Sequence, residues 1–209
     1  MILDGELRPG QRLLQQPLAK KFGVSQSVLR ESLLEAEFTG LVETVNRLGA
    51  SVARIDRKQL FDAYEVREML EGLAARLCCA NASPADIKEL TDVAHQVHAL
   101  GVANKDKERA HLDRHLHERI IAIAGNTVLE RLSGGYHVVR LVVLNAVPHD
   151  QVLTDHLAII EAVKTNDAAG AELAARRHVV HASELIHRQI EANNFAFPWE
   201  RDSTARGDV

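Results

Sequence analysis

The chain has 209 residues, of which 26% are charged and 46% are hydrophobic, enough apolar content for one or two soluble domains with a real core. Its 12 Gly and 5 Pro are too few for a disordered, collagen-like or turn-rich β protein. The net charge is −4, but residues 1–58 carry nine Lys and Arg against seven Asp and Glu, so only this segment could face phosphate easily.

The positions of the histidines and cysteines give further information about the regions of the chain and its compartment. All 11 histidines lie at or after His95, which suggests two regions with different chemistry. Cys78 and Cys79 are adjacent and cannot link distant segments, so we expect them to be buried on a helix in a reducing cytosol. No apolar run approaches the ~20 residues of a membrane span, and no secretory leader opens the chain. These features predict a cytoplasmic protein with no membrane partner.

Residues 1–56 have the pattern of a winged helix-turn-helix domain. Pro17 can sit in the first turn of a short helix that Gly23 ends, and Ser25 can cap a second helix that ends at Gly40. Two short strands are predicted at residues 41–45 and 50–55, with a turn at residues 46–49 between them. Periodicity alone leaves open a small α/β domain with a solvated polar face.

Five stretches of this region, in order, resemble the GntR family of bacterial transcription regulators. They are Gly5–Leu13, Leu18–Ser25, Leu29–Leu33, Gly40–Val42 and Gly49–Val52. The resemblance implies a homodimer on a palindromic, double-stranded DNA operator, with the second helix in the major groove and the hairpin as a wing. The expected DNA contacts are Arg12, Gln26, Ser27, Arg30, Arg47 and Gly49.

Three departures from the family pattern affect the DNA-reading region. Gln26-Ser27 stands where Arg-Thr is usual, which favours adenine readout or weaker binding, and Val28 replaces a Pro. Only Met1–Asp4 precede Gly5, where the family has a full helix. We therefore expect the first helix to be truncated and the domain to be less stable for it.

Residues 57–194 are predicted to form an all-α antiparallel bundle, and residues 195–209 a polar tail. The predicted helices span residues 57–80, 84–103, 105–124, 126–147, 150–165 and 167–193. The fold class is thus mainly α, with an N-terminal winged helix-turn-helix and a C-terminal helical bundle.

The histidines of the bundle separate by helical angle at 100° per residue. Asp113 and His117 share an apolar face of their helix, and His156 and His178 face inward on theirs. His111, His115 and His187 fall on outer faces. Three inward imidazoles and one carboxylate suit a divalent ion such as Zn, Ni, Mn, Fe or Co, although a hydrogen-bonded core histidine is the alternative for each ring.

Residues 60–71 resemble the opening of the FCD ligand-binding domain, which occurs in the FadR subfamily of GntR regulators. The pattern Asp113-x-x-x-His117 with Gly125-Asn126, and the segments 155–163 and 167–178, resemble the metal motifs of that domain. The resemblance implies that Asp113, His117, His156 and His178 bind a divalent metal, which holds a small carboxylate effector. Leu116 replaces a common Phe, and the connection from residue 140 to residue 156 is short, which leaves the effector class open.

Three cationic or imidazole side chains are candidate effector contacts. Arg67 points inward on its helix, and its planar fork suits a carboxylate, although Glu71 one turn later could simply pair with it. Arg140 and His137 are the other two candidates, on a helix that is apolar nearly all round.

These patterns predict a transcription regulator whose operator affinity is controlled by a carboxylate metabolite at the metal. One alternative is a regulator for which the metal ion itself is the signal. A metal-dependent hydrolase or lyase would need a general base that no motif supplies, and would leave the winged helix without a role, so we do not expect an enzyme. The sequence leaves open whether binding represses or activates.

Overall fold

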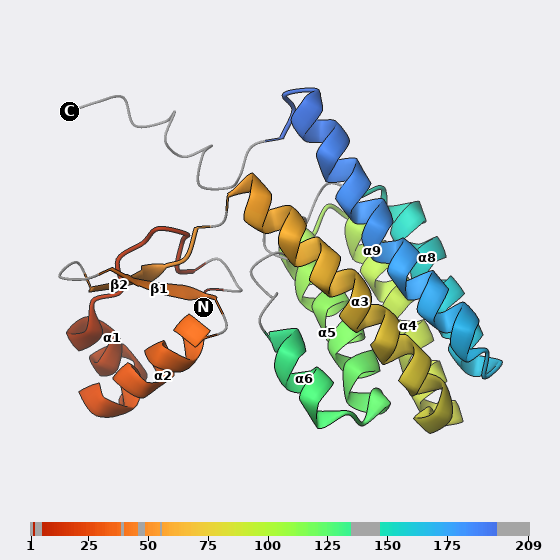
Figure 1. Cartoon of the computed structure of the whole chain (residues 1–209), viewed down its shortest axis with the longest axis horizontal. Helices are drawn as coiled ribbons and strands as arrows, with labels where there is room; N and C mark the ends of the chain where they lie inside the picture. The colour runs from red at the N-terminus through yellow and green to blue at the C-terminus, as the bar shows by residue number, and fades with distance from the viewer. Residues whose placement is uncertain are drawn as a thin grey trace.

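The computed structural model describes residue 2 and residues 6–38, 40–45, 49–54, 56–134 and 147–195. The fold is mainly α: two short helices and a β-hairpin form the N-terminal region, and long helices form the remainder (Figure 1). This arrangement confirms the predicted fold class. Only Ile2 is described among the first five residues, so the expectation of a truncated first helix falls mostly outside the described residues.

The N-terminal region contains a helix-turn-helix followed by a hairpin. Helix α1 (Gln15–Phe22) and helix α2 (Gln26–Phe38) are separated by a tight turn in which Gly23 has a left-handed φ of 67°. Strands β1 (Val42–Val45) and β2 (Gly49–Val52) pair antiparallel. Both strands are shorter than predicted, and β2 begins one residue earlier. Leu13, Val42, Ala50 and Val52 form a small core beneath α1 and α2.

The helical region starts at residue 57, and most of its helices have defined caps. The helices are α3 (Arg57–Asn81), α4 (Pro84–Val102), α5 (Asp106–Ala124), α6 (Thr127–Ser133), α8 (His149–Lys164) and α9 (Ala168–Glu191). Asp56 and Ser83 each cap a helix through a reciprocal capping box. The predicted helix over residues 126–147 begins as expected, but α6 ends at Ser133, residue 147 is not helical, and residues 135–146 lie outside the described residues.

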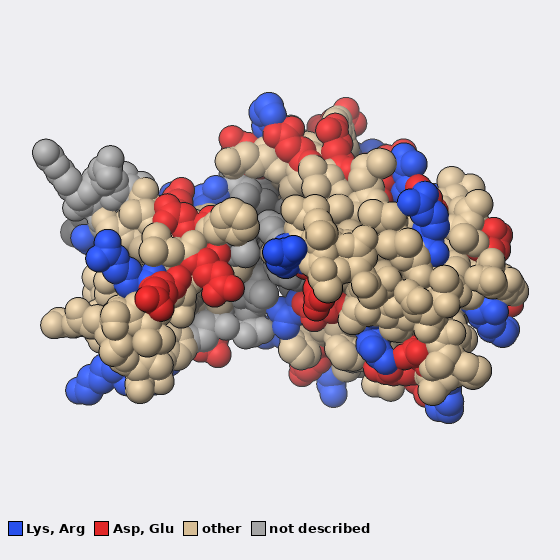
Figure 2. Space-filling view, turned by 60° about the horizontal axis from the view of Figure 1, so that its bottom comes forward, with Lys and Arg blue, Asp and Glu red and all other residues tan. Residues whose placement is uncertain are grey.

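Acidic and basic side chains are interspersed on the face of the molecule shown in Figure 2. On the left of that view several Asp and Glu side chains lie together, with Lys and Arg side chains beside them. The charge excess of residues 1–58 is small, so charge alone does not mark a surface for nucleic acid.

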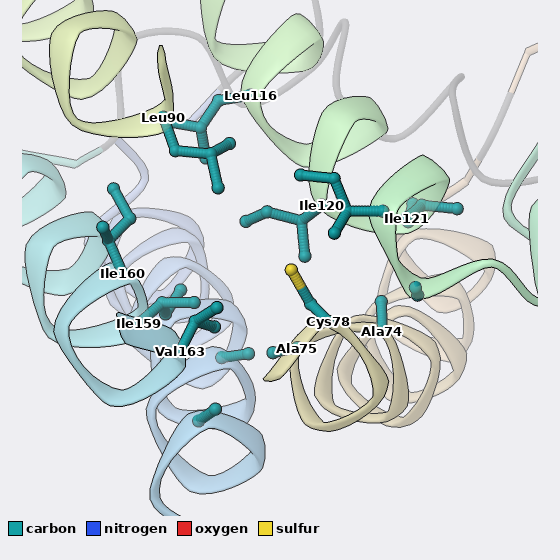
Figure 3. Packing of buried hydrophobic residues seen from close by; sticks show 14 of the residues in the cluster. Ala74, Ala75, Cys78, Leu90, Leu116, Ile120, Ile121, Ile159, Ile160 and Val163 are labelled. Carbon is teal, nitrogen blue, oxygen red and sulfur yellow. The ribbon is translucent and has the colours of Figure 1, made fainter. Parts of the chain in front are cut away.

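One apolar core joins α3, α4, α5, α8 and α9, and Figure 3 shows its centre. Cys78 lies within this core with no exposed surface, and burial raises the pKa of its thiol to about 12. Cys79 is also buried, and both cysteines are free, as the sequence predicts. Helices α3 and α9 lie side by side, and Gly72 permits this approach because a Cβ there would lie 2.7 Å from the side chain of Arg176.

Candidate functional site

Three buried histidines from three helices meet inside the bundle. His117 comes from α5, His156 from α8 and His178 from α9, and one ring nitrogen of each lies within 4.8 Å of the others. Their ring centroids are 4.8–5.3 Å apart. The exposed fractions are 3%, 0% and 7% respectively. The inward orientation predicted from helical periodicity therefore matches the burial of all three rings.

Asp113 completes the predicted set of four. It lies one turn before His117 on α5, and its side chain is 31% exposed. Its Oδ2 is 3.9 Å from Nε2 of His117, and its Oδ1 is 3.5 Å from Nε2 of His156. Two ring nitrogens from different helices thus face one carboxylate, which is a donor set that could hold a divalent ion.

His156 is the least ordinary member of this cluster. Neither of its ring nitrogens has a hydrogen-bond partner among the described residues, although buried polar atoms in proteins nearly always have one. Burial and the neighbouring His178 together lower the pKa of His156 to about 3, against the opposing effect of Asp113. The ring is therefore neutral at pH 7, which is the form that binds a metal.

A buried ion pair stands behind His117. Glu71 on α3 accepts a hydrogen bond of 2.6 Å from Nε of Arg67, and both side chains are about 4–5% exposed. The other carboxylate oxygen of Glu71 lies 2.8 Å from Nδ1 of His117. Arg67 also lies over the ring of Tyr64, at 5.6 Å from its centroid. From the sequence, Arg67 could either contact the effector or simply pair with Glu71. The structure shows the pair.

A second buried carboxylate, Asp155 on α8, stands behind His178. Its Oδ2 hydrogen-bonds Nδ1 of His181 at 3.0 Å and lies 3.7 Å from Nδ1 of His178. The Gln151 amide donates to Oδ1 at 2.9 Å. Burial raises the pKa of Asp155, but the two rings and the amide outweigh that effect and hold the pKa well below its usual value.

Two further buried charges, Asp155 on α8 and Arg109 on α5, are absent from the predicted set of site residues. Arg109 is 6% exposed and precedes Asp113 by four residues, so both lie on the same face of the helix. That i, i+4 spacing was a usable signal. The three histidines predicted to face outward, His111, His115 and His187, are exposed as expected.

A small cavity adjoins the histidine cluster. It is lined by Glu71, Ala74, Ala75, His117, Ile120, Ile121, Ile159 and Ala175. Its space is about 10 Å³, close to what one water molecule needs. Alanine side chains on α3 and α9 thus leave room beside His117.

The predicted DNA contacts lie on the surface of the N-terminal region. Gln26, Ser27 and Arg30 are exposed on the first turns of α2, and the Ser25 hydroxyl caps this helix by accepting from Val28 N at 3.3 Å. Arg12 is exposed and pairs with β2 opposite Ser51.

Of the four remaining predicted contacts to DNA or effector, only Gly49 is among the described residues. Gly49 is exposed at the start of β2 with a φ of 85°. Arg47, His137 and Arg140 lie outside the described residues.

The fold and these sites define a class of protein: a helix-turn-helix DNA-binding protein with a wing and a separate all-helical region. Residues 1–52 match the family of bacterial regulatory proteins named gntR, and residues 62–181 match the FCD domain. The chain belongs to the GntR family of bacterial transcription regulators that carry an FCD domain. The matched families and relatives are regulators and not enzymes.

Relatives support this assignment across most of the chain. The uncharacterized HTH-type transcriptional regulator YdhC of Bacillus subtilis is 29% identical over 91% of this chain and 88% of its own length. The Glc operon transcriptional activator of Escherichia coli is 30% identical over 90% of this chain and 85% of its own length. The structure of Escherichia coli McbR/YncC shares the fold, with a TM-score of 0.75, 20% identity, and coverage of 90% of this chain and 92% of its own.

A helix must be long and apolar to cross a bilayer. Within the part of the chain that the structure describes, no helix is both long enough and apolar enough to cross a bilayer.

Proposed function

We propose that this regulator binds a divalent metal ion through Asp113, His117, His156 and His178, and that a small carboxylate effector at that site controls its affinity for an operator. The observation that supports the metal site best is the burial of three converging imidazoles, one of them fully buried without a hydrogen-bond partner. A bound divalent ion would supply a Lewis-acidic centre for a carboxylate oxygen.

The residues of this chain would have distinct tasks at such a site. Three neutral imidazoles and the Asp113 carboxylate would hold the ion, and the low pKa of His156 keeps that ring in the binding form over the physiological pH range. Arg67 is a proposed contact for the effector carboxylate, which would have to share or displace the buried pair that the guanidinium makes with Glu71. Arg109 is a second buried cation on the face of α5 that carries Asp113.

We propose that the winged helix reads the operator as part of a cytoplasmic homodimer. Two copies would place two α2 helices in successive major grooves of a palindromic site, with Gln26, Ser27 and Arg30 toward bases and phosphates. The proposed further contacts are Arg12, Arg47 and Gly49. The presence of Gln26 favours an adenine at the base it reads.

The names of relatives agree with operon control by small molecules. One is the Glc operon transcriptional activator already described, and another is the probable D-xylose utilization operon transcriptional repressor of Paenarthrobacter nicotinovorans, 26% identical over 85% of this chain. By analogy we propose that this chain regulates an operon whose product or substrate is a small metabolite, as in the FadR subfamily that the sequence resembles.

The test is a mobility-shift assay on the intergenic DNA upstream of the gene, with the metal concentration held constant and carboxylic acids added in turn. An acid that changes the DNA affinity of the wild type, but not of a His156→Ala,His178→Ala double variant, supports the proposal. An unchanged response in the double variant would show that the histidines are not part of the effector site. A control variant, His187→Ala, removes an exposed histidine of the same helix as His178.

The second candidate function is metal sensing, in which the ion itself is the signal. It draws on the same buried histidines, so the assay needs a second arm in which Zn²⁺ or Ni²⁺ is titrated without any acid. A response to metal alone, with none to acids at saturating metal, would favour this alternative. By thermodynamic linkage, whichever ligand weakens DNA binding must itself bind more weakly to the DNA complex.

A further inference from the structure

Each of two histidines in the cluster has a buried carboxylate behind it. Glu71 is 4% exposed and lies next to His117, and Asp155 is 3% exposed and lies next to His178. Burying a carboxylate is costly unless it is hydrogen-bonded or paired, so both positions call for an explanation beyond packing. His156, in contrast, has no such partner among the described residues.

The Glu71 carboxylate biases which nitrogen of His117 carries hydrogen. Oε2 lies 2.8 Å from Nδ1 without the geometry of a full hydrogen bond, and its negative charge favours a proton on that nitrogen, since two lone pairs would otherwise oppose each other. The other nitrogen, Nε2, then presents its lone pair, and it lies 3.9 Å from Oδ2 of Asp113. The Glu71 carboxylate is itself held by the 2.6 Å hydrogen bond from Arg67.

Asp155 lies behind His178 at a longer distance than Glu71 does behind His117, and it is itself held by hydrogen bonds to other side chains. The Gln151 amide, one turn earlier on α8, fixes Oδ1 at 2.9 Å. Oδ2 is shared by two rings of α9, at 3.0 Å from Nδ1 of His181 and 3.7 Å from Nδ1 of His178. At 3.7 Å Nδ1 of His178 makes no hydrogen bond to this carboxylate, but the negative charge beside it favours a proton on Nδ1, which leaves the Nε2 lone pair for the cluster.

We infer that Glu71 and Asp155 are positioning residues of the metal site, which set the tautomer and the ring orientation of His117 and His178. This inference rests on the proposed metal site. In metalloproteins a ligating histidine usually donates its second N–H to a carboxylate or carbonyl, and loss of that partner typically weakens metal affinity 10–100-fold. Glu71 further connects the metal ligands to Arg67, the candidate effector contact.

The experiment measures metal binding by the full chain, by competition with a chelator for Zn²⁺ and by the visible absorption of bound Co²⁺. Asp155→Asn keeps the size of the side chain and removes its charge, and Glu71→Gln does the same. Each is expected to weaken Zn²⁺ binding about 10–100-fold and to alter the Co²⁺ spectrum. A purely structural role would lower the melting temperature in chelator but leave the Co²⁺ spectrum of the folded protein unchanged.

Matched controls come from the same two helices. Asp150→Asn alters a carboxylate on α8 whose side chain is 94% exposed, and Glu68→Gln alters one on α3 that pairs with Arg176. Both controls are expected to bind Zn²⁺ within about threefold of the wild type, below the 10–100-fold loss. Because Glu71→Gln leaves Arg67 without its carboxylate, an Arg67→Met,Glu71→Gln double variant removes both charges and is expected to show the same loss.

The outcomes separate this inference from the proposed function. If the wild type and His156→Ala both fail to bind Zn²⁺ and Co²⁺, the metal site itself is refuted. If the wild type binds and His156→Ala does not, unaltered affinity and spectrum in Asp155→Asn overturn the role of Asp155. The same result in the Arg67→Met,Glu71→Gln variant overturns the role of Glu71.

Discussion

Replacing His156 by leucine tests the link between the buried histidines and stability. The ring has no exposed surface and neither of its nitrogens has a hydrogen-bond partner among the described residues. Leucine is similar in size and has no polar atom, so it removes unsatisfied groups from an apolar core. We expect His156→Leu to be more stable than the wild type in the absence of metal and insensitive to metal.

The magnitude follows from the cost of an unsatisfied buried group. One such group costs about 1–3 kcal/mol, so the variant should gain about 2 kcal/mol in chelator after some repacking strain. For a chain of this size each kcal/mol shifts the melting temperature by about 2–4 °C. Zn²⁺ at about 1,000 times its Kd would stabilise the wild type by about 4 kcal/mol and the variant not at all, so the order of the two reverses.

The pH dependence gives an independent measure of the same ring. Burial lowers the pKa of His156 to about 3, compared with about 6.5 in an unfolded chain, so between these values the unfolded state binds one more proton. The contribution of this ring to the free energy of unfolding is therefore fully present above about pH 6.5 and is lost as the pH falls toward 3. From pH 7 to pH 5 the loss from this ring is about 2 kcal/mol, and His156→Leu should lack that part of the loss.

The assay is thermal and urea unfolding of wild type, His156→Leu and the exposed control His187→Leu, in chelator and in Zn²⁺, at several pH values. Lower stability of His156→Leu in chelator would mean that the ring is well bonded in the native protein, and would refute the reasoning about unsatisfied nitrogens. A full Zn²⁺ response in His156→Leu would remove His156 from the ligand set.

Three further predictions concern other parts of the chain. Arg30→Ala should weaken operator binding about 10–100-fold in a mobility-shift titration without altering metal content, and equal affinity would remove Arg30 from the DNA contacts. Gly23→Ala should destabilise the helix-turn-helix by about 1–2 kcal/mol, because its φ of 67° is in the left-handed region. A Cβ there would meet nothing within 4 Å, so the whole cost comes from the backbone. A neutral result in proteolysis or melting would contradict this argument. Asn126→Ala should lower the urea stability by about 1 kcal/mol, because two backbone N–H groups of α6 lose their acceptor, while Asn126→Ser should retain most of it.

Helical periodicity predicted the orientation of the cluster because each helix has one clear apolar stripe. His156 lies within the stripe that contains Val152, Ile159 and Val163, and all four are buried. The same procedure placed His187 on the outer face, where it is exposed. Periodicity works at these positions because the bundle buries one side of each helix in a single core.

The orientation of Asp155 could not be predicted in this way. It precedes His156 directly, so the two side chains point about 100° apart, and the apolar stripe contains only one of them. Helix α8 packs against both α4 and α9, so its buried arc is wider than its apolar stripe. Asp155 lies in the part of that arc that faces α9, where His178 and His181 supply its partners. Only the packing of the helices reveals this position.

Most buried side chains of the bundle are apolar, and most of the buried polar ones gather at the histidine cluster. Around the cluster, Ile159, Ala175 and Val179 follow the usual rule that apolar side chains fill the interior. The rule fails at His117, His156 and His178 and at the carboxylates behind two of them. A core selected for stability alone would replace such groups by apolar residues of similar volume, often with a gain in stability. Their place at the meeting point of three helices agrees with the ligand proposed above, whose binding free energy would offset part of their cost.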